Sequence, residues 1–156
     1  MVQANVSIRW IGLVLLVMGC HLGRPATPTA AFTVGQVVAS STEPGLEDAL
    51  KSGISSALAT REMLNEHGAA PVDIAVLAAV SQATSAGEAS QSFAARLQIS
   101  VRVEERSAQF SSERSYTVID AVQGDAARKA AFQALAQVLT EDAAEWLATA
   151  PKAEDE

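Results

Sequence analysis

The 156-residue sequence has one cysteine, two histidines and few aromatic side chains, which make up 4% of it. A single cysteine excludes an intrachain disulfide, and so few histidines and cysteines offer no zinc cluster. The sequence also lacks a glycine-rich phosphate loop, an H-E-x-x-H pair and a G-x-S-x-G elbow. These absences leave no motif that points to an enzyme, and we expect a non-enzymatic chain without a metal or a cofactor.

Positive charge is scarce as well: Lys and Arg number 11 against 18 Asp and Glu, for a net charge of −7. Nucleic-acid binding needs clustered Lys and Arg, so this composition argues against it. The apolar stretch Trp10–Met18 has only about half of the roughly 20 residues that a membrane-spanning helix needs. A transmembrane anchor is therefore the weaker interpretation of this stretch.

The first 19 residues have the layout of a secretory signal. Arg9 is the only charged residue before Cys20, and the apolar stretch follows it directly. The stretch ends in Val17-Met18-Gly19-Cys20, which resembles the lipobox of bacterial lipoproteins, in which a small residue precedes an invariant cysteine. The resemblance implies cleavage after Gly19, a diacylglyceryl group on the Cys20 sulfur and an acylated new N-terminus. The alternatives are an ordinary signal peptide with an incidental cysteine, or a helix at the membrane edge.

We expect four segments: a signal peptide (1–19), a lipidated N-terminus with a tether (20–31), one domain (32–147) and an acidic disordered tail (148–156). The tether is rich in Pro, Thr and Ala and has no hydrophobic period. Several acyl chains on Cys20 would anchor it stably to a membrane. In enteric bacteria, Asp directly after the lipidated cysteine retains a lipoprotein in the inner membrane. This chain has His21 there, so we expect the protein to be anchored at the periplasmic face of the outer membrane.

Hydrophobic periodicity in the domain predicts four strands and two helices. The strands are predicted at Phe32–Ser40, Val72–Thr84, Phe93–Val103 and Gln109–Asp120, and the helices at Leu46 to His67-Gly68 and Asp125 to Leu147. Ser41 or Thr42 is expected to cap the first helix, and Asp125 the second. Gly68 is expected to end the first helix in a left-handed conformation. The predicted apolar stripe of the second helix is Ala131, Phe132, Leu135, Val138, Leu139, Ala143, Trp146 and Leu147.

The residue alternation assigns the strand faces. The second strand places Val72, Ile74, Val76, Ala78 and Val80 on one face, but its other face is apolar too, which suggests cover on both sides. In Phe93–Val103 one face is apolar and the other polar, as in a strand with one dry and one wet side.

The last two strands are predicted to form a hairpin that turns at Glu105–Ala108. Val103 would then lie opposite Phe110, and Arg96 opposite Thr117. This single register pairs apolar residues on one face of the hairpin and polar residues on the other. Arg114 would fall opposite Ile99 as a misfit on the apolar side.

The order of these elements predicts the fold class. Strand, helix, three strands and helix give an α+β two-layer sandwich, β-α-β-β-β-α, with a mixed four-stranded sheet and both helices on one face. A right-handed crossover would join the first two strands, and the others would form an antiparallel meander. The opposite sheet face would be wet or would meet a partner.

One side-chain group stands out on that wet face: Arg96 and Arg102, with Arg106 and neighbouring Gln and Ser residues. Because Arg presents a forked donor, Arg96 and Arg102 are candidate contacts for an anionic glycolipid. The favoured interpretation is a solvated face on which these arginines pair with Glu104 and Glu113. His67 at a helix end is expected to interact with the helix dipole rather than to catalyse.

The lipobox, the short tether and one β-α-β-β-β-α domain together resemble the LptE family of lipopolysaccharide-assembly lipoproteins. Thr42-Glu-Pro-Gly-Leu-Glu-Asp-Ala-Leu50 looks like the turn and helix start of many members, and Phe93–Val103 lies where the family has a long central strand. The resemblance covers roughly Phe32 to Leu147. It implies a non-enzymatic role inside a large outer-membrane β-barrel, together with lipopolysaccharide binding.

Two other classes of function remain open. The chain could be a lipoprotein that docks on a cell-envelope enzyme and activates it, but such proteins usually have a longer tether than the one here. It could also be a ligand-binding surface lipoprotein, although an open four-stranded sheet offers little concave surface.

Overall fold

A computed structural model describes residues 31–39, 43–65, 69–86, 90–119 and 121–149. Its elements are β1 (Phe32–Val38), α1 (Leu46–Thr60), β2 (Ala70–Ala86), β3 (Gln91–Val103), β4 (Arg106–Val118) and α2 (Ala121–Thr149). The predicted signal peptide, Cys20, His21, His67 and Gly68 lie outside the described residues, as do both predicted caps of α1 and the tail from residue 150.

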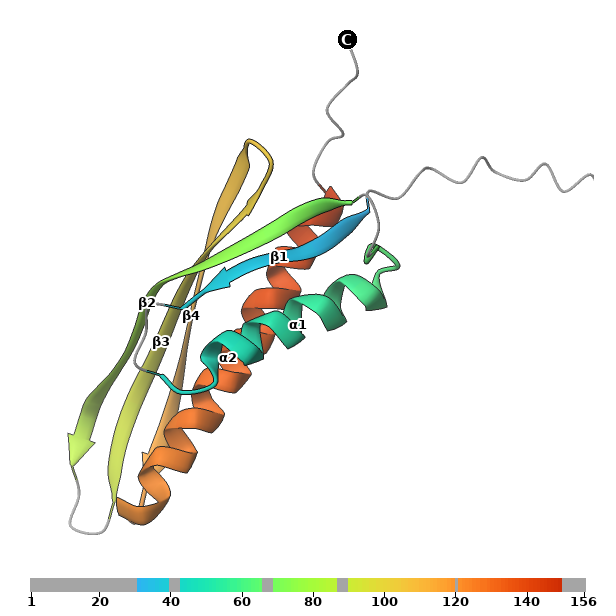
Figure 1. Cartoon of the computed structure of the whole chain (residues 1–156). Coiled ribbons are helices and arrows are strands. Elements are labelled where there is room, and N and C mark those ends of the chain that lie inside the picture. Colours follow the sequence, from blue (N-terminus) through green and yellow to red (C-terminus); the bar gives the residue numbers. More distant parts are fainter. Residues whose placement is uncertain (1–30, 40–42, 66–68, 87–89, 120, 150–156) are drawn as a thin grey trace, which may run out of the picture.

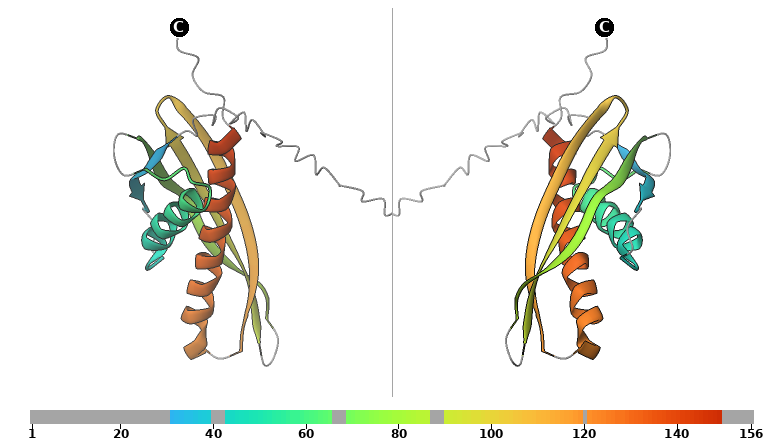
Figure 2. Two further views of the ribbon diagram at one scale, coloured as in Figure 1. Left: turned by 90° about the vertical axis from the view of Figure 1, so that its right-hand side faces the viewer. Right: turned by 90° about the vertical axis from the view of Figure 1, so that its left-hand side faces the viewer.

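The strands form one mixed sheet in the order β1-β2-β3-β4. β1 runs parallel to β2, and the other neighbours pair antiparallel. Both helices lie on the same face of this sheet, with α1 beside β1 and α2 across β3 and β4 (Figures 1 and 2). The predicted α+β fold is confirmed, including the parallel first pair and the meander.

Alternation in β3 builds the sheet side of the core. Ala95, Leu97, Ile99 and Val101 are fully buried, while Arg96 and Arg102 on the other face are exposed. From the helices, Leu50, Ile54 and Leu139 are buried against these strands. The predicted stripe of α2 is correct except at Val138, which is 45% exposed because Ala136 and Thr140 face inward instead.

Helix α1 begins at Leu46 as predicted, but its N-cap and its C-terminal end differ from the prediction. It starts after Gly45, whose left-handed φ of 77° makes the turn, and no side-chain hydrogen bond caps it. It ends at Thr60, well before His67-Gly68, and Glu62 takes the left-handed conformation (φ 56°) that was expected of Gly68. The chain then continues through Leu64, which bridges to Phe32 of β1.

Strand β2 is longer than predicted and changes face midway. Val72, Ile74 and Val76 point into the core as expected, but a bulge separates Val76 from Ala78 in the pairing with β3. One inserted residue reverses the alternation, so Ala79 packs on the core and Val80 is 42% exposed. The bulge, rather than cover on both faces, explains why both sides of the sequence are apolar.

The β3–β4 hairpin is confirmed, but its register is wrong by four residues. The turn is Glu104-Glu105, not Glu105–Ala108, and Glu104 has a positive φ of 53°. Phe110 therefore pairs with Ile99 and not with Val103. Because four is an even number, every side chain keeps its predicted face. Arg114 lies opposite Ala95 and is exposed.

Helix α2 begins at Ala121, so Asp125 lies inside the helix and is not its N-cap. With 29 residues it spans about 43 Å. β2, with 17 residues, spans about 56 Å. None of the helices in the described ranges is long and apolar enough to cross a membrane.

These long elements give the domain two ends. β1 starts at the end where α2 finishes, and the β3–β4 turn lies there too (Figure 1). β1 pairs only with Ala70–Ala75, which we call the near segment of β2. The rest of β2, Val76–Ala86, is the far segment and extends toward the start of α2 (Figure 1).

Candidate functional site

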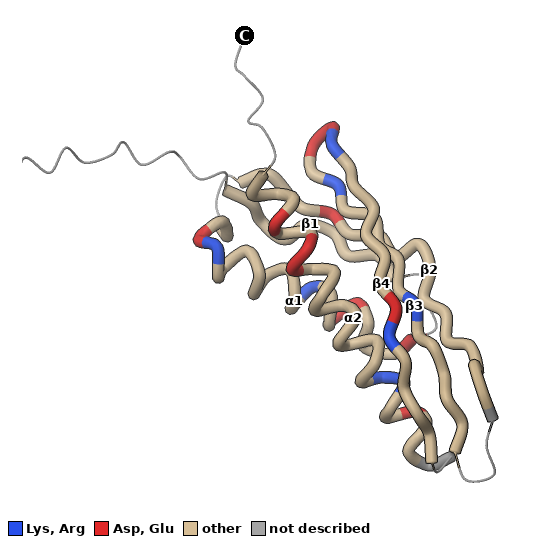
Figure 3. The backbone as a smooth tube through the Cα atoms, turned by 180° about the vertical axis from the view of Figure 1, so that it is seen from behind, with Lys and Arg blue, Asp and Glu red and all other residues tan. Residues whose placement is uncertain are grey.

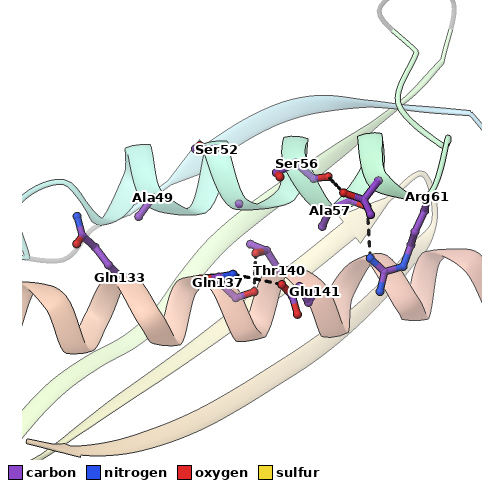
Figure 4. Close-up of a pocket in the computed structure, with 11 residues that line it drawn as sticks. Ala49, Ser52, Ser56, Ala57, Arg61, Gln133, Gln137, Thr140 and Glu141 are labelled. Atoms are coloured by element: carbon purple, nitrogen blue, oxygen red, sulfur yellow. Dashed lines mark hydrogen bonds between the residues drawn. The ribbon is translucent and has the colours of Figure 1, made fainter.

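A groove of about 640 Å³ runs between the two helices on the side away from the sheet. Its walls are small or polar side chains of α1 and α2, with Ala49, Ser52, Ser56 and Ala57 on one side and Gln133, Gln137 and Glu141 on the other (Figure 4).

The floor of this groove is set by a close helix–helix contact. A Cβ built on Gly53 would lie 2.6 Å from Thr140 Oγ1, so only glycine lets α1 approach α2 this closely. Thr140 points from α2 toward α1 (Figure 4) and is fully buried, and its hydroxyl lies 2.9 Å from the Ala136 carbonyl oxygen that accepts its hydrogen bond.

Several polar side chains along the groove form hydrogen bonds within it. Arg61 Nη1 donates to the Ala57 carbonyl at 3.3 Å, and Gln137 donates to Glu141 at 3.4 Å. The Thr60 hydroxyl donates to the Ser56 carbonyl at 2.9 Å. The groove is therefore a consequence of helix packing, and we do not take it as the functional site.

The other face of the sheet, which we call the open face, carries two ion pairs between neighbouring strands. Arg96 of β3 binds Glu113 of β4 through Nε and Nη2, at 3.1 and 2.7 Å. Arg102 approaches Asp73 of β2 at 3.4 Å. These arginines were expected to pair with Glu104 and Glu113. Glu113 does pair, with Arg96, whereas Arg102 pairs with Asp73 and not with Glu104. In Figure 3 the charged positions of the sheet are spread along its strands, from the hairpin turn to the middle of β3 and β4.

Asp73 has a second role at the edge of the open face. Its Oδ1 accepts the Gln36 backbone N–H at 2.8 Å, where β1 bulges between Val34 and Val37. A side chain at Gly35 would collide with this carboxylate, so glycine is required there. Asp73 thus joins the β1 bulge to Arg102 and orders this part of the open face. Asp73 could not be predicted from the sequence because its partners come from β1 and β3, far apart in the chain.

Apolar side chains lie beside these charges. Val38, Leu77 and Val80 are 42, 49 and 42% exposed, and Val38 pairs with Ala75 on the open face. A hollow of about 260 Å³ adjoins them, lined by Gln36, Val38, Asp73, Ile74, Ala75, Ser100 and Arg102. A sheet surface that mixes exposed apolar groups with ordered charges is typical of a protein-docking surface.

One ion pair fastens the helical layer. Glu43, just before α1, accepts from Arg128 of α2 through both carboxylate oxygens, at 2.9 and 2.7 Å. The Glu43 side chain is only 9% exposed. Its hydrogen bond to the guanidinium raises the pKa of Arg128 above the ordinary value, and this outweighs the opposing effect of burial. The pair is structural, since it joins the residue just before α1 to the first turns of α2.

An aromatic cluster closes the near end of the helical face. Phe110 of β4 meets Trp146 of α2 edge to face, with ring centroids 6.3 Å apart. The Arg106 guanidinium lies 5.1 Å from the Trp146 ring. Arg106 is therefore turned to the helical face and does not join Arg96 and Arg102 on the open face.

The structure thus places Arg96 and Arg102 on one face, on either side of Gln98 and Ser100, each with a carboxylate partner. Cys20, the predicted lipidation site, lies outside the described residues. Within the described residues, no group of three His, Cys, Asp or Glu side chains is arranged to hold a metal ion.

Comparisons with known proteins give one informative match. No family model and no curated protein matches the sequence. A crystal structure of a minor lipoprotein from Acinetobacter baumannii superposes with a TM-score of 0.53 at 12% identity, covering 77% of this chain and 91% of that one. At this identity the likeness shows a shared fold.

Two further solved structures are more distant. A DUF330 protein from Xanthomonas campestris matches at 18% identity, with a TM-score of 0.47 over 78% of this chain and 86% of that one. Rare lipoprotein B from Shewanella oneidensis matches at 11% identity, with a TM-score of 0.38 over 74% of this chain and 89% of that one. The structural neighbours thus include bacterial lipoproteins, and membership of the LptE family is not established.

Proposed function

We propose that this protein is a non-enzymatic lipoprotein, anchored through Cys20 to the periplasmic face of the outer membrane, that docks on a membrane partner through its open face. The partner proposed is an outer-membrane β-barrel that assembles lipopolysaccharide. The observation that carries the docking role is the hollow on the open face, where exposed Val38 lies beside the Arg102–Asp73 ion pair held between neighbouring strands.

The position of the tether supports this arrangement. β1 begins at the near end of the domain, so the chain that leads back to Cys20 leaves from there (Figure 1). The tether is short, which favours a partner in the same membrane over one across the periplasm. The likeness in fold to a minor lipoprotein is consistent with an anchored protein.

The anchor is tested by replacing its attachment point. In Cys20→Ala the thiol that would carry the lipid is absent, so the protein should move from the membrane to the soluble fraction. Intact mass of the wild-type chain should show loss of the first 19 residues and addition of acyl groups. An unprocessed Met1 terminus with a free thiol would contradict the proposal.

Docking is tested by affinity purification of the full chain, tagged at its C-terminus, from detergent-solubilised membranes. Gln98→Glu with Ser100→Glu places two charges in the middle of the open face and should abolish recovery of the partner. The matched control, Gln133→Glu with Gln137→Glu, adds the same charges in the helix groove and should retain it. Equal recovery by both variants would contradict docking through the open face.

The identity of the co-purified protein separates the functional classes. A β-barrel supports the lipopolysaccharide-assembly role, whereas a cell-envelope enzyme would support the activating role instead.

Glycolipid contact has its own variant, Arg96→Glu with Arg102→Glu, which should weaken binding to lipopolysaccharide micelles if these guanidinium groups contact the phosphates. Unchanged binding would leave the two arginines as structural ion pairs.

A further inference from the structure

The far segment of β2 has a free edge. β1 pairs with β2 only from Ala70 to Ala75, and β2 continues to Ala86 with β3 on its other side. No other strand in the described ranges reaches this edge. β1 itself ends at Val38, and the next described element is α1, so this chain's own first strand does not extend along the far segment.

The chemistry of this edge is unusual for an unpaired strand. Natural sheets protect their edges with lysine and other charges, proline or a short strand length. From Ile74 to Ala86 the sequence contains no charged residue and no proline. β4, which forms the opposite edge of the sheet, carries Arg106, Glu113 and Arg114. The ends of the strands near the far segment are uncharged in Figure 3.

Many side chains of the far segment are exposed, although Ala79 packs on the core and the Ser81 hydroxyl lies 2.7 Å from the Tyr116 hydroxyl. Val80 is 42% exposed on the open face, and Gln82, Ala83, Thr84 and Ser85 are exposed as well. Neither helix covers this edge, because α2 lies over β3 and β4 and α1 lies beside β1 (Figures 1 and 2). Among the described elements, neither a strand nor a helix therefore occupies this edge.

We propose that the far segment pairs antiparallel with the far segment of a second copy of this chain, joining the two sheets into one. Bulges at Leu77 and near Thr84 leave Ala78–Ala83 as the regular stretch, so the two-fold axis falls within it. In such an isologous pair both copies contribute the same surface. Residues on the open face of one copy then lie opposite open-face residues of the other copy.

Edge charges and proline protect a strand from pairing with another chain, and their absence from the far segment favours a second copy as the occupant. The chain has a net charge of −7, so most of its surface repels another copy of itself. The far segment is a long uncharged surface, and two copies can meet there without opposing like charges. Because the pairing uses the strand edge, and the open-face partner of the proposed function uses side chains in the middle of the sheet, neither inference depends on the other.

The test measures the mass of the full lipidated chain in detergent by sedimentation, corrected for bound detergent. The wild-type protein should have the mass of two chains at high micromolar concentration and of one chain on dilution. Val80→Lys with Gln82→Lys should have the mass of one chain throughout, because lysines of the two copies would face each other. Val80→Glu with Gln82→Glu should do the same.

A mixture of the two variants should recover the mass of two chains, since lysine then meets glutamate. This recovery separates loss of pairing from loss of folding. Ser115→Lys with Thr117→Lys, exposed positions on the opposite edge strand β4, should leave the two-chain mass unchanged. The open-face variant Gln98→Glu with Ser100→Glu should also keep it, so failure of docking and failure of pairing are distinguished.

Three results would overturn the proposal. A wild-type chain that stays single at every concentration excludes self-pairing, and so does a two-chain mass that survives both charged variants. A one-to-one complex between this chain and a different protein, lost in Val80→Lys with Gln82→Lys but kept in Gln98→Glu with Ser100→Glu, would assign the edge to a foreign strand instead.

Discussion

The near segment of β2 pairs with a strand on each side, whereas the far segment pairs on one side only. In the near segment Val72 and Ile74 are 0 and 1% exposed, under the layer formed by the two helices. In the far segment Leu77 and Val80 are 49 and 42% exposed. One strand therefore contributes stability at its beginning and offers unused backbone hydrogen-bonding groups at its end.

This difference follows from the lengths of the elements. β1 has 7 residues and β2 has 17, so β1 covers less than half of its neighbour. α1 has 15 residues and lies beside β1, while α2 with 29 residues extends over β3 and β4 to the far end. Burial is concentrated where both helices are present, and substitutions should reveal this difference.

The largest expected contrast lies along β2 itself. Ile74→Ala leaves a cavity in the near segment and should lower the free energy of unfolding by about 2–5 kcal/mol. Val80→Ala removes an exposed side chain from the same strand and should change it by no more than about 0.5 kcal/mol. Denaturant unfolding of the full chain followed by circular dichroism measures both. Similar losses at the two sites would remove the distinction between the segments.

Two helical glycines sharpen the comparison. Gly53→Ala forces α1 away from Thr140 and should cost about 1–3 kcal/mol of stability. Gly124 of α2 lies at the far end, where an added Cβ meets Val118 at 3.4 Å, an ordinary contact. Gly124→Ala should therefore leave stability unchanged or raise it by up to about 1 kcal/mol.

The Gly53 effect has an internal check. Thr140→Ala in the Gly53→Ala background removes the hydroxyl that the new methyl group would meet, and should recover part of the loss. A double-mutant cycle measures this coupling. Strictly additive effects would mean that the helix contact does not depend on these two residues.

A smaller effect is expected where α1 is joined to α2. Glu43→Gln leaves Arg128 without its carboxylate and should cost about 1–2 kcal/mol, since Glu43 is nearly buried while Arg128, 38% exposed, is partly screened by water. Arg128→Lys keeps the charge but loses the paired geometry and should cost less. Thermal unfolding of both variants shows which substitution lowers the stability more.

The pH dependence of this pair follows from the raised pKa of Arg128. A raised pKa makes the stabilising contribution complete below the ordinary arginine value and removes it only as the pH rises through the raised value. The stability difference between wild type and Arg128→Lys should therefore stay constant across neutral pH. A difference that falls between mildly acidic and mildly alkaline pH would contradict this assignment.

The smallest effect is expected on the open face. The side chains of Arg96 and Glu113 are 65 and 48% exposed, so Arg96→Ala should cost about 0.2–1 kcal/mol, and less at high salt. A larger, salt-independent loss would mean that the open face contributes to the core of the fold rather than to docking.

The sequence predicted the layers of this fold because alternation in β3 and periodicity in the helices depend on local burial. It did not predict the hairpin register, because Glu104 supplies the left-handed turn position without the Asn or Gly that usually marks it. For the same reason Glu62 ended α1 before Gly68. In both cases an ordinary residue adopts a backbone conformation that its type does not indicate.

The open face was only partly predictable. Glu113 was expected to pair with an arginine of this face, but the predicted register placed Arg96 opposite Thr117, and the corrected register places it opposite Glu113. Asp73 was missed because its contacts with Gln36 and Arg102 depend on the bulge in β1 and on pairing across three strands. The face reversal in β2 was missed because one inserted residue at Leu77 leaves no mark in an apolar sequence.

Hydrogen–deuterium exchange along β2 of the full chain, followed over a dilution series, tests the account most directly. Amides of Val72 and Ile74 should exchange slowly and at the same rate at every concentration, because both neighbouring strands and the helices protect them. Amides of Ala78–Ala83 that point away from β3 should exchange quickly in dilute samples and slow down as concentration rises. A far segment that is as protected as the near segment in the most dilute sample would contradict a free edge.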